Sequence, residues 1–282
     1  MPSGSPETRL FDPIRLPFRQ EVFLVLHGLN LHPARMEAWR ELLRREGFAV
    51  AQVALAGHDP ADRRGWGRVS ASLWLEDLER ACAQARARWP GAALSLCGYS
   101  LGATLGLDWS LERGAPWRRA LLIAPALAVR WYLAPLLWLS RFLLPGALPL
   151  PSLAPRAYRA HGTTPLAAFR ALAALIARLE QGLERLPEFP QFVIYVEGDE
   201  LISTRHLLHY RGRRGAGVLL HPLALPRFRR YPRHLAIDPT TLGEARWRRL
   251  TADVSAWLNA APRSEPTEPN EPRGTMQGSE GP

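Results

Sequence analysis

Short apolar runs alternate with longer amphipathic stretches in the first half of the chain. The runs are rich in Val, Leu, Ile and Ala, and they cover 21–26, 49–55, 94–99 and 119–126. Continuous apolar runs of this length are typical of strands buried on both faces. The stretches between them carry apolar residues at helical spacing, at about 33–45, 70–88 and from 101 onward. This alternation predicts an α/β fold, with a mostly parallel central sheet flanked by helices.

The alternation then stops. Residues 127–186 are too long for an ordinary connection between two elements, and their first part is apolar nearly all round. A helical stretch rich in Ala and Leu follows, from about 165 to 186. We interpret 127–186 as a helical cap inserted over the strand ends, in which Trp131, Trp138 and Phe142 bind the apolar part of a substrate. A packed helical layer without a ligand and a surface in contact with lipid are the alternatives.

Two further apolar runs, at 191–196 and 217–223, predict the last strands, and apolar spacing over 241–258 predicts a final helix. The chain is therefore expected to contain an arm, a core in two pieces, the cap between them and a tail. The boundaries are 1–20 for the arm, 21–126 and 187–260 for the core, 127–186 for the cap and 261–282 for the tail. The tail has almost no apolar residues, which predicts disorder.

The most informative motif is Gly98-Tyr99-Ser100-Leu101-Gly102, which follows a predicted strand and precedes a predicted helix. In that context, G-x-S-x-G forms a tight turn that exposes the Ser hydroxyl above the sheet. The Leu101 N–H lies at the helix N-terminus, where unpaired donors favour a developing negative charge. The pentapeptide alone is equally compatible with a tight turn whose serine is incidental, so the rest of the chain has to decide.

Acyl transfer by Ser100 requires a base that removes the hydroxyl proton and a carboxylate that orients that base. Asp199 follows a later predicted strand, and His234 lies in the loop after the last one. Ser, Asp and His in this order, each at the carboxyl end of a strand, are the arrangement that accompanies this motif. Glu197 and Glu200 are alternatives for the acid. The alternatives for the base are His206, His209 and His221.

Two backbone donors are candidates for the oxyanion hole. Leu101 N–H follows the nucleophile, and Leu29 N–H follows His27-Gly28 at the end of the first predicted strand. Gly28 would let the backbone and a substrate approach closely. His27 is expected to brace this loop by hydrogen bonds, and His58 is expected to brace the loop after the second strand.

Composition changes the picture only a little. The formal net charge is +10 and all 36 basic residues are arginine. They accompany no recognition module, so a nucleic-acid partner is not expected, although a basic surface can assist peripheral contact with an anionic membrane. Cys82 and Cys97 fit neither a disulfide framework nor a metal site, and no metal or organic cofactor is expected. The absence of a secretory signal and of a run of about 18 apolar residues favours a cytoplasmic location.

Five motifs together resemble the α/β-hydrolase superfamily, and most closely its carboxylesterase and monoacylglycerol-lipase-like branch. They are His27-Gly28-Leu29-Asn30, Ala56-Gly57-His58, Gly98-Tyr99-Ser100-Leu101-Gly102, Gly198-Asp199-Glu200-Leu201-Ile202-Ser203 and His234. The resemblance covers about residues 20–260. It implies the α/β-hydrolase fold, with an eight-stranded type of sheet, a cap between the sixth and seventh strands, and a serine hydrolase without a cofactor.

The resemblance also implies roles for single residues. The nucleophile, acid and base would be Ser100, Asp199 and His234, and the oxyanion donors would be the N–H groups of Leu29 and Leu101. The sequence departs from the family around His234, which lies in a segment unusually rich in Arg and Pro.

The expected function is hydrolysis of carboxylic esters of lipophilic acyl groups, such as a monoacylglycerol, through a Ser-His-Asp triad and an acyl-enzyme. The same site could serve a thioesterase or an acyltransferase, because the fold and the triad are shared across chemistries. A catalytically inactive protein of this fold that binds lipid or a membrane is the alternative from another functional class.

Overall fold

The computed structural model describes residues 7–59, 63–128, 145–146, 148–152, 154–227 and 229–260. Trp131, Trp138 and Phe142, which we predicted to bind substrate in the cap, lie outside the described residues, and so does the tail at 261–282. What we expect of these residues stays a prediction.

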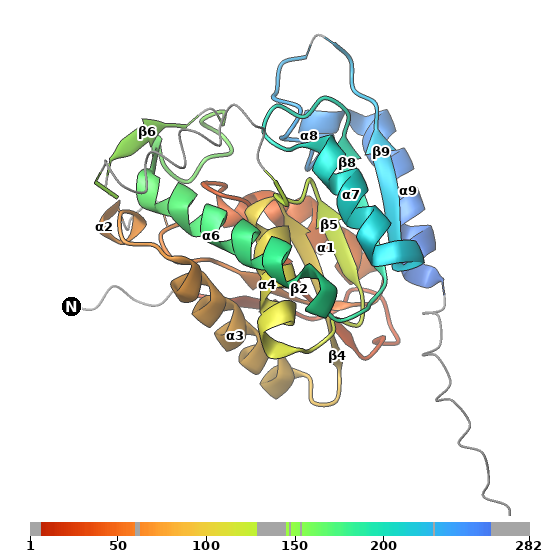
Figure 1. Ribbon diagram of the computed structural model, residues 1–282. Coiled ribbons are helices and arrows are strands. Elements are labelled where there is room, and N and C mark those ends of the chain that lie inside the picture. The colour runs from red at the N-terminus through yellow and green to blue at the C-terminus, as the bar shows by residue number, and fades with distance from the viewer. Residues whose placement is uncertain are drawn as a thin grey trace, which may run out of the picture.

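A seven-stranded sheet forms the centre of the described structure (Figure 1). Its strands are β1 (Arg9–Phe11), β2 (Glu21–Leu26), β3 (Ala49–Val53), β4 (Ala93–Tyr99), β5 (Ala120–Ile123), β8 (Gln191–Val196) and β9 (Val218–Leu223). They lie in the order β1-β3-β2-β4-β5-β8-β9, and every neighbouring pair is parallel except β1 with β3. All residues of β2 and β5 are buried, which explains their continuous apolar runs. The predicted mostly parallel α/β architecture is confirmed.

Helices cover both faces of this sheet. They are α1 (Glu37–Arg45), α2 (Arg63–Trp66), α3 (Ala71–Arg88), α4 (Leu101–Arg113), α6 (Leu166–Gly182), α7 (Thr204–Arg214), α8 (Pro239–Leu242) and α9 (Glu244–Asn259), with short 3-10 helices η1 (Pro33–Met36), η2 (Leu183–Arg185) and η3 (Gly215–Gly217). Apolar residues of α3, α4 and α6 share one core cluster, and those of α1, α8 and α9 share another. Along β2, Val22 and Leu24 belong to the first cluster and Phe23 and Val25 to the second, as the alternation of a strand requires.

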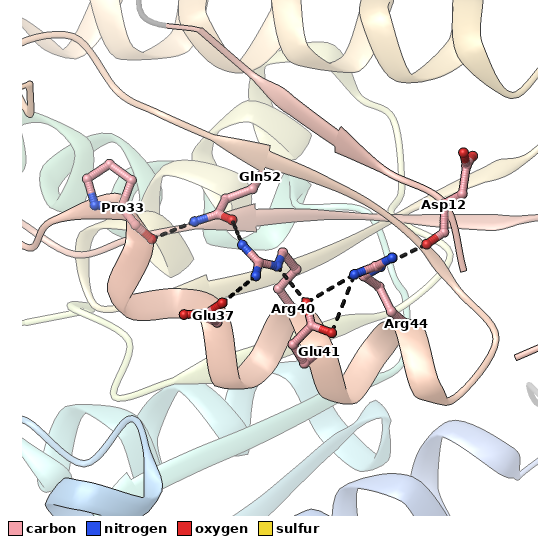
Figure 2. Close-up of polar contacts among 7 residues, drawn as sticks. All are labelled: Asp12, Pro33, Glu37, Arg40, Glu41, Arg44 and Gln52. Atoms are coloured by element: carbon pink, nitrogen blue, oxygen red, sulfur yellow. Dashed lines mark hydrogen bonds and ion pairs between the residues drawn. The ribbon is translucent and has the colours of Figure 1, made fainter. Parts of the chain in front are cut away.

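β1 lies within the segment that we interpreted as an N-terminal arm. Three residues are too few to show a periodic pattern, so the sequence did not reveal this strand. The chain just after β1 is held by α1, because Arg44 donates from Nε to the Asp12 carbonyl oxygen over 2.8 Å (Figure 2). The resemblance implied an eight-stranded type of sheet; over the described ranges the sheet has the seven strands given above.

A second side chain of α1 ties this helix to the sheet. Arg40 pairs with Glu37 at 2.7 Å and with Glu41 at 2.9 Å, and it donates to Gln52 Oε1 in β3 at 3.0 Å (Figure 2). Gln52 in turn donates to the Pro33 carbonyl oxygen over 2.6 Å. The guanidinium therefore connects the helix to the strand, because its planar fork of donors can serve several acceptors at once, and Gln52 extends the connection to η1.

The predicted final helix over 241–258 is divided in two. Gly243 has φ +84°, a left-handed conformation that interrupts a right-handed helix, and it separates α8 from α9. Asp238 caps α8 by accepting the Thr241 N–H over 2.8 Å. Thr241 therefore lies inside the short α8 and does not open a long helix.

α6 lies in the second half of the segment that we interpreted as a cap, and it packs on α4. A Cβ added to Gly182 would come within 2.4 Å of the Leu111 side chain, so the two helices meet closely there. In Figure 1, α6 runs alongside α4 on the same face of the sheet. A small antiparallel pair, β6 (Pro149–Pro151) with β7 (Thr163–Pro165), precedes α6. How much of 127–186 covers a substrate stays a prediction.

None of the described helices combines the length and the apolar character needed to span a membrane.

Candidate active site

The turn at Ser100 joins β4, a central strand, to α4. Ser100 has φ +51° and ψ −112°, an unusual conformation for a residue other than glycine. The flanking glycines are required by space: a Cβ on Gly98 would lie 2.5 Å from the Ala103 backbone, and a Cβ on Gly102 would lie 2.6 Å from the Leu26 carbonyl oxygen. The motif therefore forms the strand–turn–helix that its sequence predicted.

The structure brings Ser100, His234 and Asp199 into one hydrogen-bonded row. His234 Nε2 lies 2.9 Å from Ser100 Oγ, and His234 Nδ1 lies 2.8 Å from Asp199 Oδ2. All three residues are at least nine-tenths buried. With Nδ1–H donating to the carboxylate, Nε2 is left to accept the serine proton, which is the arrangement that a general base requires.

Hydrogen bonds to both carboxylate oxygens hold Asp199 as an anion. Its Oδ1 accepts the Leu201 N–H at 2.8 Å and the Ile202 N–H at 3.0 Å, while Oδ2 faces His234. Burial by itself would raise the pKa of this carboxyl. The charge and hydrogen bond of His234 and the two backbone donors outweigh burial and lower the pKa below its ordinary value.

The alternatives for acid and base lie elsewhere. The Glu197 side chain is exposed, and the Glu200 carboxylate accepts the backbone N–H groups of Arg233 and His234. Neither contacts the imidazole ring in the hydrogen bonds of the described residues. The remaining histidines are likewise occupied or distant: His206 contacts Ser203, His209 is exposed on α7, and His221 lies 3.8 Å from Asp253.

The loop after β2 passes directly beside Ser100. A Cβ on Gly28 would lie 2.6 Å from the Tyr99 ring and 3.3 Å from Ser100 Cβ, so only glycine fits this approach. Leu29 is the next residue after Gly28. Leu101 is the first residue of α4, and the N–H groups in the first turn of a helix have no carbonyl partner within that helix. Both candidate oxyanion donors therefore belong to segments that border Ser100.

His27 and His58 brace this loop as neutral side chains. His27 Nε2 accepts the Leu55 N–H at 3.1 Å, and its Nδ1 lies 3.0 Å from the Gly28 carbonyl oxygen. His58 Nε2 accepts the Asn30 N–H at 3.1 Å. Burial lowers the pKa of His27 to about 4 and lowers that of His58 well below its ordinary value, so both rings are poor proton acceptors and good hydrogen-bond acceptors.

Two residues near the site were not singled out by sequence reasoning. Tyr99 Oη donates to the His234 carbonyl oxygen at 3.0 Å, and burial, then the charges of Asp199 and Glu200, raise the pKa of this phenol so that it stays a donor. Asn30 has φ +53° and bonds the backbone of His161 through both ends of its amide. Both residues occupy motif positions, but no spacing rule links either of them to its distant partner.

Over the described ranges, no group of three or more His, Cys, Asp or Glu side chains is arranged to hold a metal ion.

Comparison with known proteins gives one family match and many matches in fold. Residues 19–157 match the model of a hydrolase family described as serine aminopeptidase, S33. No curated protein sequence matches the chain.

Solved structures that are similar in fold cover nearly the whole chain. A metagenome-derived lipolytic enzyme is 20% identical, with a TM-score of 0.68 over 92% of this chain and 98% of its own. A soluble variant of the monoglyceride lipase of Saccharomyces cerevisiae is 13% identical, with a TM-score of 0.70 over 92% and 96%. A monoacylglycerol lipase of Paleococcus ferrophilus is 18% identical, with a TM-score of 0.69 over 90% and 98%.

The family match includes Ser100 and the loop after β2 that lies beside it. The chain therefore has the α/β-hydrolase fold, and it resembles the carboxylesterases and monoacylglycerol lipases that share this fold.

Proposed function

We propose that this protein is a serine hydrolase that cleaves carboxylic esters of lipophilic acyl groups. The observation that carries the proposal is the row of contacts from Ser100 Oγ through the His234 ring to Asp199, at 2.9 and 2.8 Å. These residues come from three separate places in the sequence, and a shared position at strand ends brings them together.

The chemistry follows from this row. Ser100 Oγ attacks the ester carbonyl carbon while His234 Nε2 takes the hydroxyl proton, and Asp199 stabilises the imidazolium that results. The N–H groups of Leu29 and Leu101 donate to the oxyanion. When the intermediate collapses, the C–O bond to the alcohol breaks and His234 returns the proton to that oxygen. Water then repeats the attack on the acyl-enzyme and releases the carboxylic acid.

A lipophilic acyl group is supported by two observations. Residues 127–144 are apolar nearly throughout, and several proteins of similar fold are named as lipases or esterases. A monoacylglycerol is therefore the substrate class to test first.

Labelling with a fluorophosphonate probe, followed by mass mapping of the adduct, tests the nucleophile. We expect an adduct on Ser100 in the wild-type protein, none in Ser100→Ala, and unchanged labelling in Ser72→Ala, whose serine is exposed on α3. A panel of p-nitrophenyl esters of increasing chain length then tests the acyl preference. A folded wild-type protein that neither reacts with the probe nor cleaves any ester of the panel would refute the proposal.

A further inference from the structure

Both carboxylate oxygens of Glu200 accept hydrogen bonds from the backbone of the loop that carries His234. This loop lies between β9 and α8, and we call it the histidine loop. Its Oε1 accepts the Arg233 N–H at 2.7 Å, and its Oε2 accepts the His234 N–H at 3.0 Å. Glu200 directly follows Asp199, so two adjacent carboxylates hold His234 in different ways. Asp199 binds the ring, whereas Glu200 binds the main chain.

The His234 peptide is also held from its other side. Tyr99 Oη donates to the His234 carbonyl oxygen at 3.0 Å, and Tyr99 immediately precedes the nucleophile. Arg233 adds a third attachment, because its Nη1 donates to the Glu197 carbonyl oxygen at 2.9 Å. These contacts tie the histidine loop to the carboxyl ends of β4 and β8, which carry Ser100 and Asp199.

His234 itself belongs to no helix or strand. His234 lies between the end of β9 at Leu223 and the start of α8 at Pro239, in a segment whose described residues form bends and irregular backbone. The backbone hydrogen bonds of a strand or helix therefore do not fix the position of the imidazole relative to Ser100. Displacement of a reacting group by about 1 Å is enough to slow a reaction by about 100-fold, so such a loop needs specific anchors.

We propose that Glu200 is a positioning residue for His234: by accepting the N–H groups of Arg233 and His234, its carboxylate holds the imidazole in line between Asp199 and Ser100. This inference rests on the proposed function, in which His234 is the general base. It also gives a role to a carboxylate that the sequence left as an alternative acid.

The carboxylate is well suited to a test because Glu200 is exposed. The Tyr99 and Arg233 contacts still hold the loop when the side chain is truncated, so the fold is expected to survive Glu200→Ala. Glu197 provides a matched control, since its exposed carboxylate lies three residues away and only its backbone carbonyl contacts Arg233. Glu200→Gln keeps the length of the side chain and one acceptor oxygen.

The experiment compares kcat and KM for p-nitrophenyl butyrate, and the rate of fluorophosphonate labelling, in the wild type, Glu200→Ala, Glu200→Gln and Glu197→Ala. For Glu200→Ala we expect kcat and the labelling rate to fall about tenfold with KM within about twofold of the wild type. Glu200→Gln should lie between this variant and the wild type. Glu197→Ala should stay within about twofold of the wild type in both constants.

Two results would overturn the proposal: an active wild type with kcat unchanged in Glu200→Ala, or an equal loss in Glu197→Ala, which would trace the effect to negative charge near the site. Failure of the proposed function looks different, because the wild type itself would then be unreactive toward both probe and ester.

Discussion

Acidification is expected to destabilise this protein through a histidine that cannot accept a proton while folded. His27 is completely buried, and burial lowers its pKa to about 4 from an ordinary value of 6.5. Its Nε2 accepts the Leu55 N–H, and a proton on that nitrogen would remove the acceptor. In the unfolded chain the same ring is expected to titrate near its ordinary value.

The sign and size of the effect follow from this difference. Below the ordinary value the unfolded state binds a proton that the folded state does not, so the stabilisation is complete above about pH 6.5 and is lost as the pH falls toward 4. Between pH 7 and pH 5, a group with these two pKa values costs the folded state roughly 2 kcal/mol. His58, whose pKa is lowered in the same direction, adds to this loss.

Urea unfolding of the wild type, His27→Gln and His209→Gln at pH 7 and pH 5 tests this account. Glutamine retains an acceptor near the position of Nε2 but does not titrate, so the free energy of unfolding of His27→Gln should fall about 2 kcal/mol less than that of the wild type. His209 is exposed on α7, so its variant should follow the wild type. Equal pH dependence in the wild type and His27→Gln would refute the reasoning.

Two further predictions concern the segments that frame Ser100. Gly98→Ala would place a methyl group 2.5 Å from the Ala103 backbone, and denaturant unfolding should show a free energy of unfolding lower by about 3 kcal/mol. Gly212→Ala is the control, because nothing lies within 4 Å of the added methyl group, and its free energy of unfolding should change little. Asn30→Ala removes hydrogen bonds of 3.0 and 2.8 Å to the His161 backbone and should cost about 3 kcal/mol because both backbone groups are left buried without this partner. A loss below about 1 kcal/mol in either variant would contradict the corresponding account.

The central strands were predictable because burial on both faces of a sheet requires continuous runs of apolar residues. β2 and β5 are entirely buried, and every residue in them is apolar except Glu21 at the start of β2. β1 was not predictable, because it has three residues at the edge of the sheet and two of them are exposed. They show neither an apolar run nor an alternation of apolar and polar residues. The packing of α6 on α4 was equally hidden: composition predicts a helix, but it does not tell which surface the helix will cover.

For the candidate site, the sequence predicted which residues come together, but it did not predict the contacts that each of them makes. Asp199, Glu197 and Glu200 are all carboxylates near the end of β8, and sequence alone leaves all three as candidates. The choice depends on the backbone, because Gly198 takes φ +72° and the chain turns so that Asp199 faces the ring while Glu200 reaches the main chain of the same histidine. A local sequence pattern does not specify the direction in which a turn presents each side chain.

The excess of arginine has a structural use that composition could not reveal. The sequence suggested a basic surface, yet several guanidinium groups donate to backbone carbonyl oxygens where helices and strands end. Arg119 reaches Leu258 at 2.9 Å, Arg214 reaches Leu186 at 2.7 Å, and Arg229 reaches Thr241 at 2.6 Å. A guanidinium suits this task because it offers five donors in a fixed plane and never loses its charge. Arg233 does the same at Glu197 beside His234. The Arg- and Pro-rich segment that departs from the family pattern thus contains one of the anchors of the histidine loop, and its unusual composition is compatible with a fixed base.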